Sequence, residues 1–211
     1  AEALRTDFAD AEPLRQTLLH KAPKYGNDVA WVDELGKRWL DYFADRLEEH
    51  RNARGGPYHM GMYTVSAHIP MGSHVGATPD GRHAKEPLAD GGMSPVYGRD
   101  VSGPTAVLNS VGRVGSYRGS NGTLLNMKFL PQFFREPEDR AKFVGMLRGF
   151  CRLGIHHVQF NVVDRETLLE AKEHPEQYAS LTVRVAGYTA YFTELAESLQ
   201  DEIIARTFYG N

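Results

Sequence analysis

The order of the apolar patterns is the feature that most constrains the fold of this chain. Helical patterns fill residues 1–56, and from residue 57 onward short β-type runs alternate with amphipathic helices. Alternation of this kind favours parallel strands, so we expect an α/β fold. The 211 residues suffice for one large domain or two small ones. We therefore expect a helical segment over 1–56 and a main domain over 57–211.

The helical patterns come with their own boundary signals. Asp28 and Asp164 stand where a helix N-cap is expected, and Pro104 suits a first helical turn. A stripe of large apolar residues recurs every four positions after Asp28 and predicts one buried face: Trp31, Leu35, Trp39, Phe43 and Leu47. The expected helices cover residues 12–21, 29–50, 104–111, 138–153, 165–173 and 195–207.

Strands are expected where β-branched and aromatic residues gather. The candidate strands cover residues 62–69, 123–129, 156–163 and 181–185, and a loop-rich stretch occupies 70–104. Four strands are too few to close a barrel, so they form either a part of one or a small open sheet.

The last expected strand ends at Gly187, within Arg184-Val185-Ala186-Gly187-Tyr188. Glycine reaches backbone conformations that are closed to other residues, so a plain turn is one interpretation. A chemical interpretation also exists. Loss of one α-hydrogen leaves a radical that flattens and delocalises into both flanking peptide groups, and a side chain would crowd that planar form. The pentapeptide alone leaves both interpretations open.

This pentapeptide resembles the radical motif of the glycyl radical enzymes. Other segments resemble the C-terminal region of the same family and occur in the family's order. They are residues 22–28, 51–56, 76–82, 86–91, 103–107, 121–126 and 157–161. The resemblance implies a C-terminal part of a ten-stranded α/β barrel, with the glycine on a loop inserted in the barrel. A fragment, a separately encoded subunit or one piece of a complex would leave strand edges and apolar faces to be covered by another chain.

The resemblance also implies roles for particular residues. Gly187 would be the catalytic residue that stores the radical, and Arg184, Val185, Ala186 and Tyr188 would shape its loop. Arg184 is expected to pair with a carboxylate, and Tyr188 to pack over the loop. No bound cofactor is implied, because the radical is itself a protein-derived cofactor. A separate activating enzyme with an iron–sulfur cluster and S-adenosylmethionine would install it.

The reactive cysteine of the family lies in an upstream loop with a Gly-Cys-Val-Glu-like pattern, which this sequence lacks. Cys151 stands at helical spacing from Phe143, Met146, Leu147 and Phe150, so we expect a small buried apolar residue there. The implied partners are the cysteine-bearing N-terminal part of such an enzyme, the activating enzyme and a small-molecule substrate, with a homodimer of the whole enzyme possible. Alone, the chain is expected to lack turnover.

Side chains of the first expected strand offer a candidate substrate pocket. Ser66 and His68 share one face of that strand, and Tyr63 lies on the other. Pocket lining and barrel packing both remain open for these three residues. Adjacent His156 and His157 point to opposite sides and show no ligand spacing, so no metal site is expected.

Composition excludes several classes of function. A net charge of −3 without a dense Lys/Arg stripe argues against nucleic-acid binding. No apolar run is long enough to span a bilayer, and no secretion signal precedes the first helix. A single cysteine fits a reducing cytoplasm, which is the expected location.

The preferred hypothesis is the radical-storing C-terminal part of a glycyl radical enzyme that cleaves C–O, C–C or C–S bonds anaerobically. Residues 76–82 and 120–127 look more like the diol and hydroxyproline dehydratase branch than like pyruvate formate-lyase. Alternatives are a repair or binding subunit that replaces an oxygen-cleaved C-terminal segment, a formate C-acetyltransferase-like activity, and an α/β domain without catalytic use.

Overall fold

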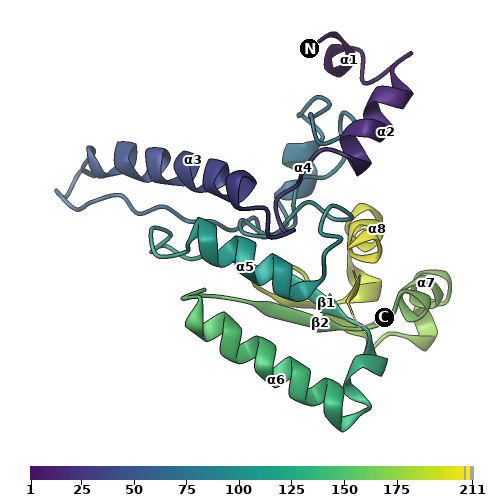
Figure 1. Cartoon of the computed structure of the whole chain (residues 1–211). Coiled ribbons are helices and arrows are strands. Elements are labelled where there is room, and N and C mark those ends of the chain that lie inside the picture. The colour runs from purple at the N-terminus through teal and green to yellow at the C-terminus, as the bar shows by residue number, and fades with distance from the viewer. Residues whose placement is uncertain (207, 210–211) are drawn as a thin grey trace.

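A three-stranded parallel sheet lies at the centre of the molecule, in a computed structural model that describes residues 1–206 and 208–209 (Figure 1). Strand β1 (Asn126–Phe129) lies between β2 (Gln159–Val162) and β5 (Phe208–Tyr209). The register pairs Asn126 with Gln159 and Phe129 with Tyr209. The expected parallel α/β arrangement is thus confirmed for the strands near residues 126 and 160.

Helices surround this sheet, with α5 above it and α6 below it in Figure 1. Asp164 caps its helix as expected, because its carboxylate accepts a hydrogen bond from the Thr167 amide at 2.7 Å. The expected helices are confirmed within a few residues at each end; residue 207 of the last one lies outside the described residues. The α-helices are α1 (Glu2–Arg5), α2 (Glu12–His20), α3 (Ala30–Glu48), α4 (His68–Gly72), α5 (Pro104–Val114), α6 (Pro137–Arg152), α7 (Arg165–Glu173) and α8 (Glu197–Ala205), with 3-10 turns at Pro131–Phe134, Pro175–Gln177 and Phe192–Glu194.

Two apolar clusters hold these elements together. The first joins β1 to α5 and α6 and includes the fully buried Val107 and Phe129. The second joins α7 and α8 to the segment around Val185, through Leu168 and Ile203. Both flanks of the sheet are therefore packed, and the second cluster also contacts the region that carries Gly187.

The strand expected over 62–69 is wrong. Met62 alone makes a parallel bridge to Thr123, and α4 begins at His68. The chain turns between them, where Val65 has a φ of 56°, outside the extended region. The backbone of Gly92 also lies so close to Met62 that an added Cβ would sit 2.1 Å from the Met62 carbonyl carbon. Tertiary packing overrides the β-propensity of this segment.

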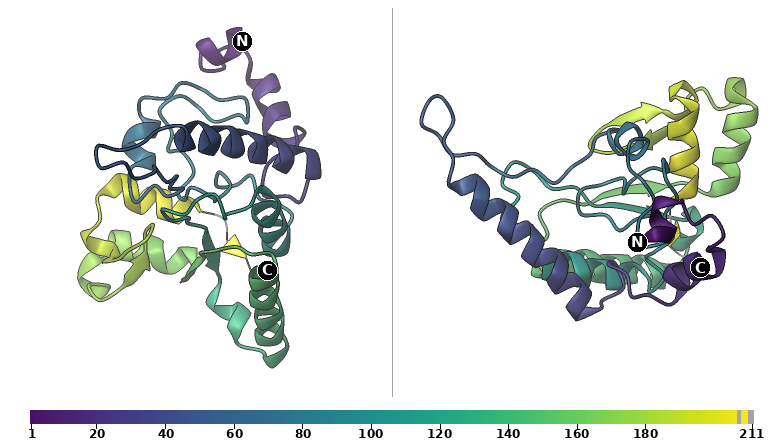
Figure 2. Two further views of the ribbon diagram at one scale, coloured as in Figure 1. Left: turned by 90° about the vertical axis from the view of Figure 1, so that its left-hand side faces the viewer. Right: turned by 90° about the horizontal axis from the view of Figure 1, so that it is seen from above.

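Two further expectations need correction in the first helical segment. The carboxylate of Asp28 does not cap α3; instead it accepts hydrogen bonds from Arg113 (2.7 Å) and Asn109 (2.8 Å). The apolar stripe of α3 is mostly exposed, with Trp31 at 63% and Trp39 at 68%. Helix α3 and the loop after it extend away from the sheet (Figure 2), so no other described element covers this face.

The strand expected over 181–185 exists as β3 (Thr182–Arg184) but is not part of the parallel sheet. It pairs antiparallel with β4 (Thr189–Tyr191), in the register Arg184 opposite Thr189. A short turn joins only antiparallel neighbours, because parallel strands need a long crossover. We call residues 182–191 the Gly187 hairpin.

Candidate functional site

Gly187 lies at the exposed tip of the Gly187 hairpin. The turn is closed by a hydrogen bond from the Val185 amide to the Tyr188 carbonyl at 2.9 Å. Gly187 has a φ of 87°, in the left-handed region that favours glycine, whereas a Cβ there would meet only Leu124 at 3.6 Å. The turn therefore requires glycine for its backbone conformation and not for lack of space.

Three amide side chains of the parallel sheet form hydrogen bonds with the backbone of this hairpin. Gln159 and Asn161 are two positions apart on β2 and share a face, and Asn126 of β1 pairs in register with Gln159. Asn161 accepts from the Arg184 amide (2.7 Å) and donates to the Arg184 carbonyl (2.6 Å), as a neighbouring strand would. We call Asn126, Gln159 and Asn161 the amide row.

The amide row also reaches the residues next to Gly187. Gln159 Oε1 accepts a hydrogen bond from the Gly187 amide at 3.0 Å. Asn126 Nδ2 and Gln159 Nε2 donate to the Val185 carbonyl at 3.3 and 3.4 Å. The peptide group on the N-terminal side of Gly187 is thus fixed by a side chain, although the glycine itself faces outward.

Arg206, directly after α8, adds a charged donor to the same turn. Its Nη1 donates to the Val185 carbonyl at 2.8 Å and to the Arg184 carbonyl at 3.3 Å. Asp90 lies 2.9 Å from its Nε, and Glu202 lies 2.8 Å from its Nη2. A buried arginine is therefore neutralised on one side and bonded to the hairpin backbone on the other.

The protonation of these groups follows from their burial and their partners. Burial raises the pKa of Asp90, with repulsion from Glu202 adding to it and attraction to Arg206 opposing it. Burial also acts to raise the pKa of Glu202, but hydrogen bonding to His68 and attraction to Arg206 outweigh it, so the net direction is down. Burial opposes the charge of Arg206, yet Asp90 and Glu202 raise its pKa overall. The arginine stays charged in this setting.

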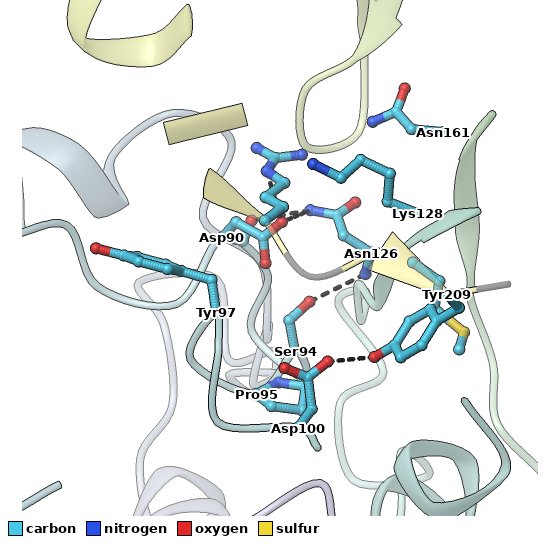
Figure 3. Close-up of a pocket in the computed structure, with 11 residues that line it drawn as sticks. Asp90, Ser94, Pro95, Tyr97, Asp100, Asn126, Lys128, Asn161 and Tyr209 are labelled. Carbon is cyan, nitrogen blue, oxygen red and sulfur yellow. Dashed lines mark hydrogen bonds and ion pairs between the residues drawn. The ribbon is translucent and has the colours of Figure 1, made fainter. Parts of the chain in front are cut away.

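A cavity of about 20 Å³ is lined by Asn126 and Asn161 of the amide row and by the loop that carries Asp90 (Figure 3). It is large enough for one water molecule. Lys128 of β1 lines it, donates to the Ile203 carbonyl at 2.7 Å and lies 3.4 Å from the Phe208 ring centroid. Burial lowers the pKa of Lys128 to about 7, and the nearby Arg206 charge acts in the same direction. The cavity is too small for an organic substrate.

The residues expected to shape the glycine loop all lie in the hairpin turn or beside it. Val185 and Ala186 are buried, and Tyr188 packs against the second apolar cluster. Among residues 1–206 and 208–209, Arg184 forms no ion pair of the expected kind; its guanidinium donates to Gln159 Oε1 and to Thr189 Oγ1, both at 3.0 Å. An amide takes the place of the expected carboxylate because β2 presents Gln159 at that position.

The three expected pocket residues do not converge. Tyr63 is about half exposed and accepts a hydrogen bond from Asn121 Nδ2 at 3.3 Å. Ser66 lies in the turn before α4 and is partly buried. His68 is buried, with Nε2 3.2 Å from Glu202 Oε2. His68 therefore connects to the Gly187 hairpin through Glu202 and Arg206, and not through a shared strand face with Ser66.

Cys151 is exposed, which corrects the expectation of a buried thiol. It lies on the outer side of α6, whereas Phe143, Met146 and Phe150 of that helix pack into the first apolar cluster. His157 Nδ1 lies 2.8 Å from the Thr123 carbonyl. Over residues 1–206 and 208–209, no three His, Cys, Asp or Glu side chains gather as a metal site would require. Within the same residues, every helix is too short or too polar to cross a membrane.

Sequence reasoning missed most of the groups that hold the hairpin. Asn126, Gln159 and Asn161 are uncharged polar residues that alternate with apolar ones inside the expected strands, and this pattern was a usable signal. Asp90 stands in a glycine-rich loop and Arg206 at a helix end, where charged residues are common, so neither gave a signal. Only the folded arrangement brings them together.

Comparison with known proteins relates the chain to one group of enzymes. A family model described as glycine radical matches residues 89–193, and one described as pyruvate formate lyase-like matches residues 1–72. The probable dehydratase YbiW of Escherichia coli is 46% identical, with 98% of this chain and 26% of that protein covered. The isethionate sulfite-lyase of Oleidesulfovibrio alaskensis is 40% identical, with 98% and 25% covered.

Solved structures agree with these matches. The glycerol-bound B12-independent glycerol dehydratase of Clostridium butyricum superposes with a TM-score of 0.94 at 42% identity, covering 100% of this chain and 26% of that one. Hydroxyproline dehydratase of Clostridioides difficile, with trans-4-hydroxy-L-proline bound, gives 0.93 at 36% identity, covering 100% and 26%. The similarity confirms the expected α/β barrel type of fold. The chain spans about a quarter of the length of these relatives.

Proposed function

Since the chain belongs to the glycyl radical enzymes of the pyruvate formate-lyase-like family, we propose that it stores a radical at Gly187 for a lyase of the dehydratase type. The observation that carries the proposal is the hairpin tip itself. It presents an unsubstituted α-carbon at a φ of 87°, inside the region matched by the glycine radical model, with the preceding peptide group held by Gln159. Fixed peptide groups on a glycine suit a radical that delocalises into them.

The proposed chemistry exchanges single hydrogen atoms. The Gly187 α-carbon radical takes the hydrogen of a cysteine thiol supplied by another part of the enzyme, which leaves a thiyl radical there. The thiyl radical takes a hydrogen atom from a carbon of the substrate, the substrate radical loses water, and the product radical takes the hydrogen atom back from the thiol. What the residues of this chain contribute is the placement of the glycine, while the exclusion of water around it falls to the part of the enzyme that covers Gly187.

Two exposed features support the proposal that a cysteine-bearing part covers this chain. Gly187 is exposed, although a stored radical must be kept from oxygen and water. The α3 face with Trp31, Trp39 and Phe43 is also exposed, and soluble proteins rarely leave such an apolar stripe open. We propose that the N-terminal part of the enzyme covers both features.

The choice of a dehydratase follows the relatives. The 46% identical protein is named a probable dehydratase, and glycerol and hydroxyproline dehydratases superpose along the whole chain. The sulfite-lyase at 40% identity makes C–S cleavage the second candidate. Product analysis of the activated, complete enzyme with a diol and with isethionate separates the two reactions.

Electron spin resonance tests the radical site directly. Anaerobic incubation with an iron–sulfur, S-adenosylmethionine-dependent activating enzyme is expected to give a doublet from the single α-hydrogen that remains on Gly187. Gly187→Ala should abolish the doublet. Because its φ is positive, alanine there also costs about 1–2 kcal/mol of stability.

Gly154→Ala is the matched control, since Gly154 also has a positive φ (65°) and no atoms near its added Cβ. The control should keep the doublet at a similar cost in stability. A doublet in Gly187→Ala, or none in the wild-type chain with an activating enzyme proven on another glycyl radical enzyme, contradicts the proposal.

In air, the activated chain should break at Gly187 and release a piece that begins at or near Tyr188, which mass spectrometry detects.

A further inference from the structure

A few polar side chains join the Gly187 hairpin to the parallel sheet, in addition to the apolar packing of Val183 and Val185 against α7 and α8. The amide row supplies neutral donors and acceptors from β1 and β2, as described above. Arg206 supplies a charged donor from a different element, the end of α8. The Val185 carbonyl is the common acceptor, with contacts from Asn126, Gln159 and Arg206 at 3.3, 3.4 and 2.8 Å. The shortest of these three contacts comes from the charged group.

Arg206 is held in place for this contact by two carboxylates outside the hairpin. Its side chain is 5% exposed and forks between Asp90 and Glu202. Glu202 contacts His68, and Asp90 accepts a hydrogen bond from Asn126 Nδ2 at 3.0 Å. An arginine can satisfy two carboxylates and a carbonyl at once because its donors lie in a rigid plane, which a lysine ammonium cannot reproduce.

We propose that Arg206 is a positioning residue that latches the Gly187 hairpin in its closed place, and that its release is a step in freeing the hairpin for the activating enzyme. If the hairpin leaves the amide row while α8 stays in place, both contacts of Arg206 to the Arg184 and Val185 carbonyls must break. The latch itself rests only on the contacts described; its role in activation rests on the proposed function.

Amide hydrogen exchange on the full chain tests the latch without any radical. In Arg206→Lys the positive charge opposite Asp90 and Glu202 is kept, so the fold is expected to survive, while the fork to the hairpin is lost. The amides of Arg184, Val185 and Gly187 should exchange at least about 10-fold faster than in the wild-type chain. The amides of β1 and β2 should be unchanged.

Arg82→Lys is the matched control. Arg82 is also buried, at 2% exposed, and its guanidinium also binds backbone carbonyls, among them that of Glu86 at 2.6 Å. This variant should accelerate exchange within residues 76–86 and leave the Gly187 hairpin unchanged. Unchanged hairpin amides in Arg206→Lys, or acceleration by the same factor in β1 and β2, would overturn the latch.

The rate of radical formation supplies a second readout, which a purely structural arginine would not change. If the activating enzyme binds only the released hairpin, a 10-fold larger open population should raise the initial rate by up to about the same factor in Arg206→Lys and leave Arg82→Lys at the wild-type rate. Equal rates in all three proteins overturn the role in activation. Absence of a radical from the wild-type chain overturns the proposed function instead, and hydrogen exchange then decides the latch alone.

Discussion

The parallel sheet and the Gly187 hairpin are neighbours that are held by different forces. The sheet combines backbone ladders with an apolar core, in which the fully buried Phe129 ring contacts Phe133, Phe134, Phe143, Phe160 and Tyr209 at centroid distances of 5.2 to 6.0 Å. The hairpin has its own short ladder, but side-chain hydrogen bonds from Asn161, Gln159 and Arg206 join it to the sheet.

This difference has a consequence for motion. Removing an apolar side chain from the core leaves a cavity, whereas a hydrogen bond that breaks as a segment moves out into solvent is replaced by one to water at a small net cost. A segment that must leave its place and return is therefore better attached by polar side chains than by buried aromatic rings. The Gly187 hairpin is thus joined to the sheet by contacts that water can replace, while Val183 and Val185 pack it against α7 and α8.

The largest effect on stability is expected from a substitution in the apolar core of the parallel sheet. Phe129→Ala should lower the free energy of unfolding by about 3–5 kcal/mol, because it leaves a cavity among packed aromatic rings. Urea denaturation followed by circular dichroism measures this value. Tyr58→Ala, which truncates a 48% exposed ring, is the control and should change stability by less than about 0.5 kcal/mol. Equal losses in both variants would break the comparison.

The buried Lys128 should make the stability of the folded chain rise with pH above 7. Its pKa is lowered to about 7 in the folded chain, chiefly by burial, from 10.5 in the unfolded chain, so the unfolded chain binds more protons between these values. The unfavourable contribution of Lys128 is complete below pH 7 and is relieved as pH rises. Relative to Lys128→Met, the wild-type chain should gain roughly 3 kcal/mol between pH 7 and 10. A difference that stays constant over this range contradicts the assignment.

A smaller effect is expected where the two parts meet. Asn161→Leu removes both hydrogen bonds to Arg184 and leaves its amide and carbonyl without that partner, at a cost of about 1–3 kcal/mol. Hydrogen exchange should show the loss in residues 182–191 and not in β1. Asn109→Leu, at an exposed amide that binds Asp28, is the control and should leave the hairpin unaffected. Loss of protection throughout the sheet would mean that the two parts are one cooperative unit.

The smallest effect on stability is expected on α3. Trp39→Ser removes a side chain that is 68% exposed and should change the free energy of unfolding by less than about 0.5 kcal/mol. The same change should weaken association with the cysteine-bearing part of the enzyme, measured by native mass spectrometry. A destabilisation above 1 kcal/mol in the isolated chain would show that this face packs internally.

The sequence predicted local structure well where the residues of one segment determine its conformation. The helix at 165–173 with its Asp164 cap, and the strands near residues 126 and 160, follow from patterns within those segments. The segment 62–69 failed because its conformation depends on the Gly92 backbone packed against Met62. The α3 stripe failed for a related reason: periodicity identifies an apolar face, but not whether the chain at hand supplies its cover.

In the candidate site, too, local patterns identified some residues, and only the folded chain brings the others together. Gly187 could be singled out from its motif, and its positive φ agrees with the need for glycine. Tyr63, Ser66 and His68 were chosen from strand alternation, and the turn at Val65 removes that basis. Asp90, Glu202 and Arg206 come from distant parts of the chain, so no local pattern could have joined them.

The connection order of the chain also bears on its synthesis at the ribosome. Asn126, Gln159 and Asn161 all precede the Gly187 hairpin in sequence, and Arg206 follows it. Because Arg206 is synthesised 15 residues after Tyr191, the last residue of the hairpin, its contacts with the Arg184 and Val185 carbonyls can form only after α8 has been translated.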